Sequence, residues 1–139
     1  MTHPGRAALG RLAPATVAAL AEVDRVVAAT IDATTLALVR HRVHALLGLP
    51  LPADAGRDVP PATWDALDDW ATSPTVDDAQ RALLGFVEQF VFAVSGMGDA
   101  EVDALLEHLD PIALHELCNA VWAVDLGARV DHVAAAVLA

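Results

Sequence analysis

The chain has 139 residues, of which 55% are hydrophobic, and a formal net charge of −11 at pH 7. This length suits one domain with a core of its own. The acidic excess repels phosphate and therefore argues against nucleic acid and membrane as partners. No charge-free apolar run reaches the roughly 18 residues of a transmembrane helix, and the first residues lack a signal-peptide pattern. We therefore expect a cytoplasmic protein whose excess of apolar residues closes an interface in a homo-oligomer.

The cysteine count excludes several kinds of site, and the absence of lysine points to the type of genome. Cys118 is the single cysteine, which excludes an intrachain disulfide and any paired-cysteine redox or zinc motif. All eight basic residues are arginine, and together with the abundant alanine this bias indicates a bacterial genome of high GC content. The sequence predicts no cofactor.

The first dozen residues include a proline and two glycines, and they predict a flexible arm over residues 1–12. One all-α domain of about six helices is expected over residues 13–139, because no segment alternates polar and apolar residues as strands do. The first predicted helix begins at Pro14 and runs to about Ile31, with one apolar face formed by Val17, Leu20, Val23 and Val27.

Asp32 is predicted to cap a second helix that ends near Gly48, with an apolar stripe that includes Leu36, Val39 and Val43. Residues 49–61 predict a loop, because proline and glycine recur there too often for a helix. A short helix is then expected to begin at one of the two prolines that close this loop and to carry Trp64, Leu67 and Trp70.

Thr75 and Asp78 resemble a capping box that would begin a central helix ending at Gly96. Asp99 is predicted to cap a brief helix after it. Residues 110–111 are Asp-Pro, the pair that suits the N-cap and first position of a long terminal helix.

Glu88 is the most informative residue, since only it and Gln89 are polar between Ala82 and Val94. A helix that is apolar nearly all round lies inside a bundle, so at least one of these two side chains is expected to point inward. A buried carboxylate is either paired or held near neutrality, and both states are common at functional sites. If the terminal helix faces it, Arg129 would be the natural partner. A structural ion pair and an acid–base role therefore both stay open.

Two histidines of the second helix are further candidates, because His41 and His44 lie three residues apart on one face. His44 could act as a general base, or it could orient a substrate carboxylate together with Arg40. The alternative is a solvated or interface edge of an amphipathic helix. No third ligand stands at a recognisable spacing, so we predict no metal site.

The terminal helix adds two constellations. His115 and Cys118 could form a nucleophile or metal pair, although a lone cysteine in a helix is usually a small buried hydrophobe. Asp125 and Arg129 are four residues apart, with Trp122 on the same side, and an ordinary helical ion pair is the simplest interpretation. Trp122 and Arg129, with Arg40 and His41, are the predicted substrate-binding residues.

Three parts of the chain share one pattern. Residues 38–48 read LVRHRVHALLG, residues 70–74 and 81–90 read WATSP and RALLGFVEQF, and residues 99–105 and 120–129 read DAEVDAL and AVWAVDLGAR. In order and texture they resemble the helices of the alkylhydroperoxidase D-like, or carboxymuconolactone decarboxylase, superfamily over about residues 32–132. The resemblance implies an oligomeric helical bundle, a dimer or a trimer-based assembly.

Redox members of that superfamily carry a glutamate, two cysteines and a histidine at positions that here fall on Ala37, Leu49, Pro52 and Gly56. The resemblance therefore implies a member that cannot cycle a disulfide and is not a thiol peroxidase. One hypothesis is a cofactor-independent lyase-like or isomerase-like enzyme of a bacterial biosynthetic pathway. It would act on a small apolar metabolite, with Glu88 as acid or base. The other is a catalytically inactive oligomeric binding or scaffold protein that retains the fold.

Overall fold

The computed structural model describes residues 2–138, and this part of the chain is all-helical, as predicted, without a strand. It contains seven α-helices and two short 3-10 helices, which follow one another in the order α1 (Pro4–Leu12), α2 (Pro14–Thr30), α3 (Ala33–Leu47), α4 (Pro61–Asp65), η1 (Leu67–Asp69), α5 (Asp78–Ala93), η2 (Val94–Gly96), α6 (Asp99–Leu106) and α7 (Pro111–Leu138). Within residues 2–138 no helix is long and apolar enough to cross a membrane.

Several helix ends lie where their capping residues predicted them. The Asp32 carboxylate accepts a hydrogen bond from the backbone N–H of Thr35 at the start of α3, and Gly48 ends that helix with a φ of 65°. The Asp110 carboxylate accepts from the backbone N–H of Ala113 in the first turn of α7. These local signals suffice because each cap satisfies backbone groups that the helix itself leaves free.

The predicted start of the central helix is wrong by a small margin. Asp77, not Thr75, is the N-cap of α5, and its partner in the capping box is Gln80. The brief helix α6 likewise begins one residue earlier than expected, because Gly98 is the N-cap and Asp99 is already helical. At α6 the predicted cap is thus an acidic residue of the first turn, and at α5 the cap lies two residues after the predicted Thr75; acidic residues favour both the N-cap and the first turn.

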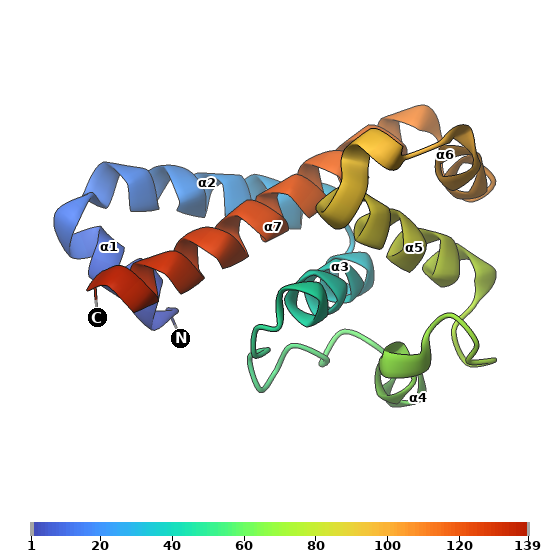
Figure 1. The fold of residues 1–139 in the computed structure, drawn as a ribbon, viewed down its shortest axis with the longest axis horizontal. Helices are drawn as coiled ribbons and strands as arrows, with labels where there is room; N and C mark the ends of the chain where they lie inside the picture. Colours follow the sequence, from blue (N-terminus) through green and yellow to red (C-terminus); the bar gives the residue numbers. More distant parts are fainter. Residues whose placement is uncertain (1, 139) are drawn as a thin grey trace.

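The N-terminal segment differs most from the prediction, because residues 4–12, expected to form a loose arm, are the helix α1 packed on the C-terminal half of α7 (Figure 1). Pro4 takes the first helical position, where its missing N–H costs nothing. Gly5 and Ala8 are buried against α7, and Arg6 forms ion pairs with Asp131 and Asp24. Gly5, one of the two glycines that predicted a flexible arm, is instead required by the close contact between α1 and α7.

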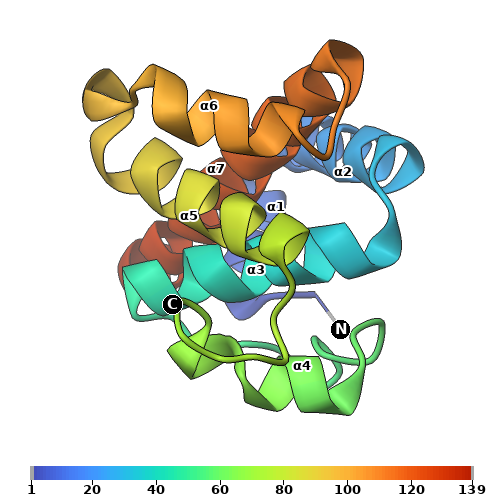
Figure 2. The same ribbon diagram turned by 90° about the vertical axis from the view of Figure 1, so that its right-hand side faces the viewer.

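The main core lies between α3, α5, α6 and α7. Figure 2 shows α6, α5, α3 and the α4 segment one above another, with α7 behind them. The fully buried side chains of this core include Leu38, Val39, Val43, Leu84, Val87, Leu105, Leu117 and Val121. A smaller cluster joins α2 to α3 and α7 through Val27, Leu36, Ala120 and Ala123. The helix α7 belongs to both clusters and therefore ties the two parts of the molecule together.

Candidate functional site

Glu88 is not the buried carboxylate that the apolar helix predicted. Its side chain is 42% exposed and lies at the edge of the contact between α3 and α5. Gln89 is not buried either and donates from its amide to the backbone carbonyl of Ala93. The prediction was wrong because α5 buries one face only, the face of Leu83, Leu84, Phe86 and Val87.

The partner of Glu88 is Arg42, not Arg129. One guanidinium nitrogen of Arg42 lies 2.6 Å from a carboxylate oxygen of Glu88, and the guanidinium carbon lies 5.6 Å from the ring centroid of Trp70. The Arg42 side chain is thus enclosed by a carboxylate and an aromatic ring, an arrangement in which ion-pair and cation–π attraction add. This cluster joins α3, α5 and the segment after η1.

His41 of α3 is buried against Trp64 of α4. Its ring meets that of Trp64 edge-on, with centroids 4.9 Å apart, and its Nδ1 has no hydrogen-bond partner among the described residues. Burial lowers the pKa of His41; Asp68 opposes this shift, whereas Arg42 and His44 reinforce it. His41 is therefore a neutral core residue near pH 7.

The remaining predicted site residues do not converge on Glu88. Arg40 is exposed, and Nδ1 of His44 lies 3.0 Å from the backbone carbonyl oxygen of Pro50, so His44 holds the loop rather than facing a cavity. No hydrogen bond or ion pair in residues 2–138 joins Glu88 to either of them or to Arg129. The predicted constellation of acid, base and carboxylate clamp is thus dispersed over the surface.

The two predicted residues of α7 lie on its solvent-facing side. Arg129 pairs with Asp125 at 2.8 Å, the intrahelical bond that their spacing predicted, and Trp122 is 54% exposed. His115 is exposed, whereas burial raises the pKa of the half-buried Cys118 thiol. In the described part of the chain no group of three or more His, Cys, Asp or Glu side chains is arranged to hold a metal ion.

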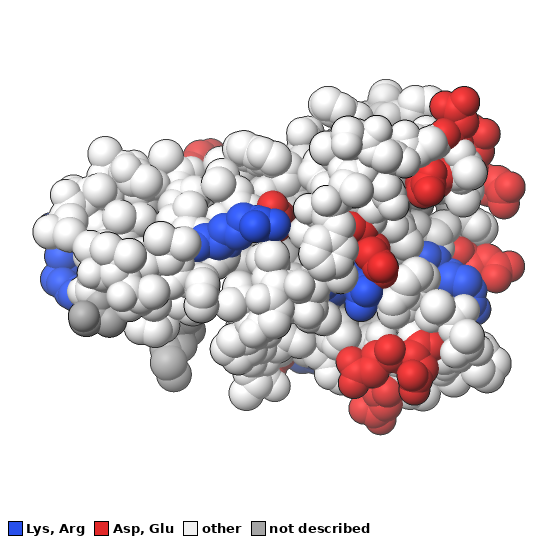
Figure 3. Space-filling view, viewed as in Figure 1, with Lys and Arg blue, Asp and Glu red and all other residues white. Residues whose placement is uncertain are grey.

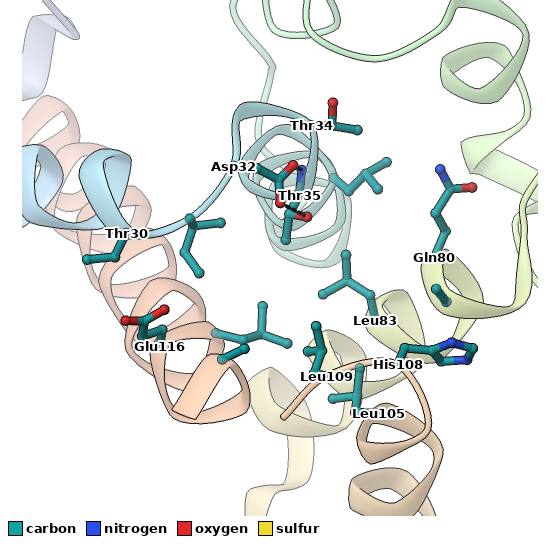
Figure 4. Close-up of a pocket in the computed structure, with 15 residues that line it drawn as sticks. Thr30, Asp32, Thr34, Thr35, Gln80, Leu83, Leu105, His108, Leu109 and Glu116 are labelled. Carbon is teal, nitrogen blue, oxygen red and sulfur yellow. Dashed lines mark hydrogen bonds between the residues drawn. The ribbon is translucent and has the colours of Figure 1, made fainter. Parts of the chain in front are cut away.

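A cavity of about 260 Å³ opens at the other end of α5, where five helix ends meet (Figure 4). Its walls come from the end of α2, the first turns of α3, α5 and α7, and the end of α6. The floor is made of leucines, among them Leu38, Leu83, Leu105, Leu109 and Leu117. The cavity is larger than the apolar cavity of about 150 Å³ that accommodates benzene, so a small organic molecule fits it.

Most polar side chains at the mouth of this cavity are engaged in holding the helix ends. Both carboxylate oxygens of Asp32 accept from Thr35, and the hydroxyl of Thr34 donates to the backbone carbonyl of Asp58. The side-chain oxygen of Gln80 accepts from Asp77 N–H within the capping box of α5. The fold holds these groups in place, and among them only the Gln80 amide N–H groups are left without a hydrogen-bond partner in residues 2–138.

Glu116 is different, because no hydrogen bond or ion pair engages its carboxylate in the described part of the chain. In Figure 4, Glu116 of α7 and His108 of the α6–α7 connection lie on opposite sides of the leucine side chains. The His108 ring also has no hydrogen-bond partner among residues 2–138, although its backbone N–H donates to the carbonyl of Leu105. The first turns of α3, α5 and α7 are each capped by an aspartate, so the positive ends of these three helices are already matched by negative charge.

No feature of the sequence predicts this cavity. Its leucines follow the ordinary spacing of core residues, and Glu116 lies between His115 and Cys118 without a pattern that marks it as a binding residue. Only the meeting of helix ends that are distant in the chain places these side chains together. Comparison with protein-family models, with curated proteins and with solved structures finds no match. The resemblance to the alkylhydroperoxidase D-like superfamily therefore stays a prediction.

Proposed function

We propose that this protein is a binding protein that holds a small apolar amine in the cavity between α3, α5, α6 and α7. The observation that carries the proposal is the leucine floor of that cavity beneath the unengaged Glu116 carboxylate. The apolar part of the ligand would pack on the leucines and so be removed from water. Its charged or hydrogen-bonding group would face the Glu116 carboxylate. Such a division of apolar and polar groups is the usual form of a small-molecule site.

The charges around the cavity favour an amine over an acid. Asp32 and Glu116 line the cavity, and the helix N-termini that could attract an anion already donate to Asp32, Asp77 and Asp110. A carboxylate ligand would meet repulsion from these carboxylates, and the side-chain donors left unengaged among the described lining residues are the Gln80 amide N–H groups and the His108 ring. An ammonium group would gain a charge-assisted hydrogen bond to Glu116.

This proposal takes up the non-catalytic of the two functions expected from the sequence. An acid–base enzyme needs its proton-transfer group within reach of the bound substrate. Glu88 is not among the residues that line the cavity, and its carboxylate faces Arg42. Binding without chemistry is therefore the function that the geometry supports best.

Thermal unfolding in the presence of benzylamine, benzyl alcohol and benzoate tests the proposal, because the three probes share a shape and differ in charge. At ten times its Kd a ligand raises the free energy of unfolding by about 1.4 kcal/mol. We expect benzylamine to raise Tm most and benzoate least, and Glu116→Gln to remove the preference for benzylamine over benzyl alcohol. Equal shifts for all three probes, or no shift at millimolar concentration, would overturn it.

A cavity-filling variant identifies the place of binding. Ala113 lines the cavity from the first turn of α7, so Ala113→Phe should abolish the Tm shift by benzylamine. The matched control is Ala100→Phe, which adds the same side chain at an exposed position in the first turn of α6. A benzylamine shift that survives Ala113→Phe would place the ligand elsewhere.

A further inference from the structure

The solvent-facing side of α7 carries a regular stripe that nothing in the described part of the chain covers. Its positions are separated alternately by three and four residues, and they are Ile112, His115, Asn119, Trp122, Leu126, Arg129, Val133 and Ala136. Seven of these eight side chains are exposed, and Leu126 is partly buried. This alternation is the heptad spacing with which helices pair in coiled coils.

The stripe is more apolar than an ordinary exposed helix face. Ile112 is 73% exposed, Trp122 54% and Val133 57%, although large apolar side chains are normally withdrawn from water. Tryptophan near the centre of such a stripe is the residue type that contributes most to protein interfaces. A helix face of this composition fits another helix of the same spacing.

We propose that the stripe joins two copies of this chain through an antiparallel pair of α7 helices. In the register that uses all eight positions, Trp122 faces Leu126 of the second copy and Asn119 faces Arg129. The outer positions then pair Ile112 with Ala136 and His115 with Val133. Polar side chains thus meet across the middle layers, and apolar side chains fill the central and outermost ones. A polar asparagine in such a seam fixes register and partner number.

The distribution of charge supports the antiparallel direction and a second copy as the occupant. Figure 3 shows acidic side chains gathered at the end of the molecule that holds α4, α5 and α6, while few charged groups appear over α1, α2 and the C-terminal half of α7. A two-fold axis near the middle of α7 places the acidic end of one copy beside the charge-poor end of the other. A parallel pair would instead bring both acidic ends together and set Arg129 against Arg129.

Light scattering after gel filtration tests the assembly. We expect a dimer at micromolar concentration for the wild type, and a monomer with unchanged helical circular dichroism for Trp122→Glu. The control Phe92→Glu adds the same charge at a side chain that is 64% exposed on α5, outside the stripe, and should stay dimeric. A monomeric or trimeric wild type, or a dimeric Trp122→Glu, would overturn the proposal. If Trp122→Glu fails to fold, Val133→Glu replaces it with the same expectations.

Disulfide trapping tests direction and register in a Cys118→Ser background, which removes the single native cysteine. The double variant Asn119→Cys/Arg129→Cys should form covalent dimers on mild oxidation, whereas Asn119→Cys and Arg129→Cys alone should not. A mixture of the two single variants should yield cross-linked heterodimers. Efficient cross-linking of Asn119→Cys to itself would indicate a parallel pair and would overturn the antiparallel arrangement.

Discussion

An arginine–carboxylate ion pair crosses each of two helix contacts, and the burial of the two pairs is the reverse of what the surrounding sequence suggests. In the α1–α7 contact, the side chains of Arg6 and Asp131 are 12% and 18% exposed. In the α3–α5 contact, those of Arg42 and Glu88 are 17% and 42% exposed. The ion pair of α1, the segment with glycine and proline, is thus enclosed, whereas the carboxylate on the apolar helix α5 is nearly half exposed.

The difference follows from how closely the backbones approach. Gly5 has no side chain, so α1 comes so near to α7 that an added Cβ would overlap the carbonyl oxygen of Asp131 and lie 2.7 Å from the backbone nitrogen of Ala135. The helices α3 and α5 are instead separated by leucine and valine side chains, and their ion pair lies at the rim. Burial of a charge thus depends on the distance between helices rather than on the apolar content of either one.

The largest expected effect breaks the closer contact. Gly5→Ala forces α1 away from α7, and overpacking of this kind costs about 3 kcal/mol. Gly10→Ala is the matched control, because its Cβ would meet only Val17 at 3.8 Å, and it should stabilise the helix by about 0.5–1 kcal/mol. Urea unfolding at one fixed protein concentration measures both. Similar midpoints for the two variants would contradict the close approach.

The second prediction removes the enclosed charge. Asp131→Asn leaves the Arg6 guanidinium with only the exposed and more distant Asp24, and we expect a loss of about 2 kcal/mol. Asp24→Asn serves as the control on the same arginine, since its carboxylate lies 3.3 Å away and is half exposed. Its effect should stay below about 0.5 kcal/mol. Equal losses for the two variants would mean that the two carboxylates share the charge evenly.

The third prediction concerns the half-open pair. Glu88→Gln should cost only about 0.5–1 kcal/mol, because water reaches the carboxylate and the amide keeps a hydrogen bond to Arg42. Asp125→Asn, which breaks an intrahelical pair, should cost about 0.3 kcal/mol. The same variants should bind benzylamine as the wild type does. Loss of binding in Glu88→Gln alone would return Glu88 to the functional site.

The smallest expected effect is the contribution of His41, on α3, to the pH dependence of the free energy of unfolding. Burial lowers the pKa of His41 in the folded state, so the unfolded chain takes up a proton there first as the pH falls below about 6.5. His41 therefore subtracts stability as the pH falls from that value toward its lowered folded pKa, and the loss is absent above it. His41→Phe should make unfolding midpoints less dependent on pH between 7 and 5. An unchanged dependence would show that His41 is solvated.

Local signals predicted most of the fold, and they failed where one element meets another. Pro14, Asp32, Gly48 and Asp110 marked helix ends correctly because each acts on its own backbone. The prediction from Gly5 was wrong, because this glycine is needed for the contact with α7, a helix more than a hundred residues away in the chain.

The candidate site was less predictable still. Arg42 directly follows the predicted site residue His41, yet the sequence pointed to Arg129 as the partner of Glu88. The leucines of the cavity carry no mark that distinguishes them from any other core residue. Which helix ends meet is decided by tertiary packing, and a single sequence holds no local record of it.

The contact between α1 and α7 also orders events during synthesis. Arg6 and Asp131 are 125 residues apart, so a ribosome adding about 5–20 residues per second makes the second roughly 6–25 s after the first. Until then the surface of α1 that Gly5 and Ala8 form has nothing to pack against. The contact of α1 with α7 therefore forms late, and a nascent chain stalled before residue 131 would leave this face of α1 open to proteases and chaperones.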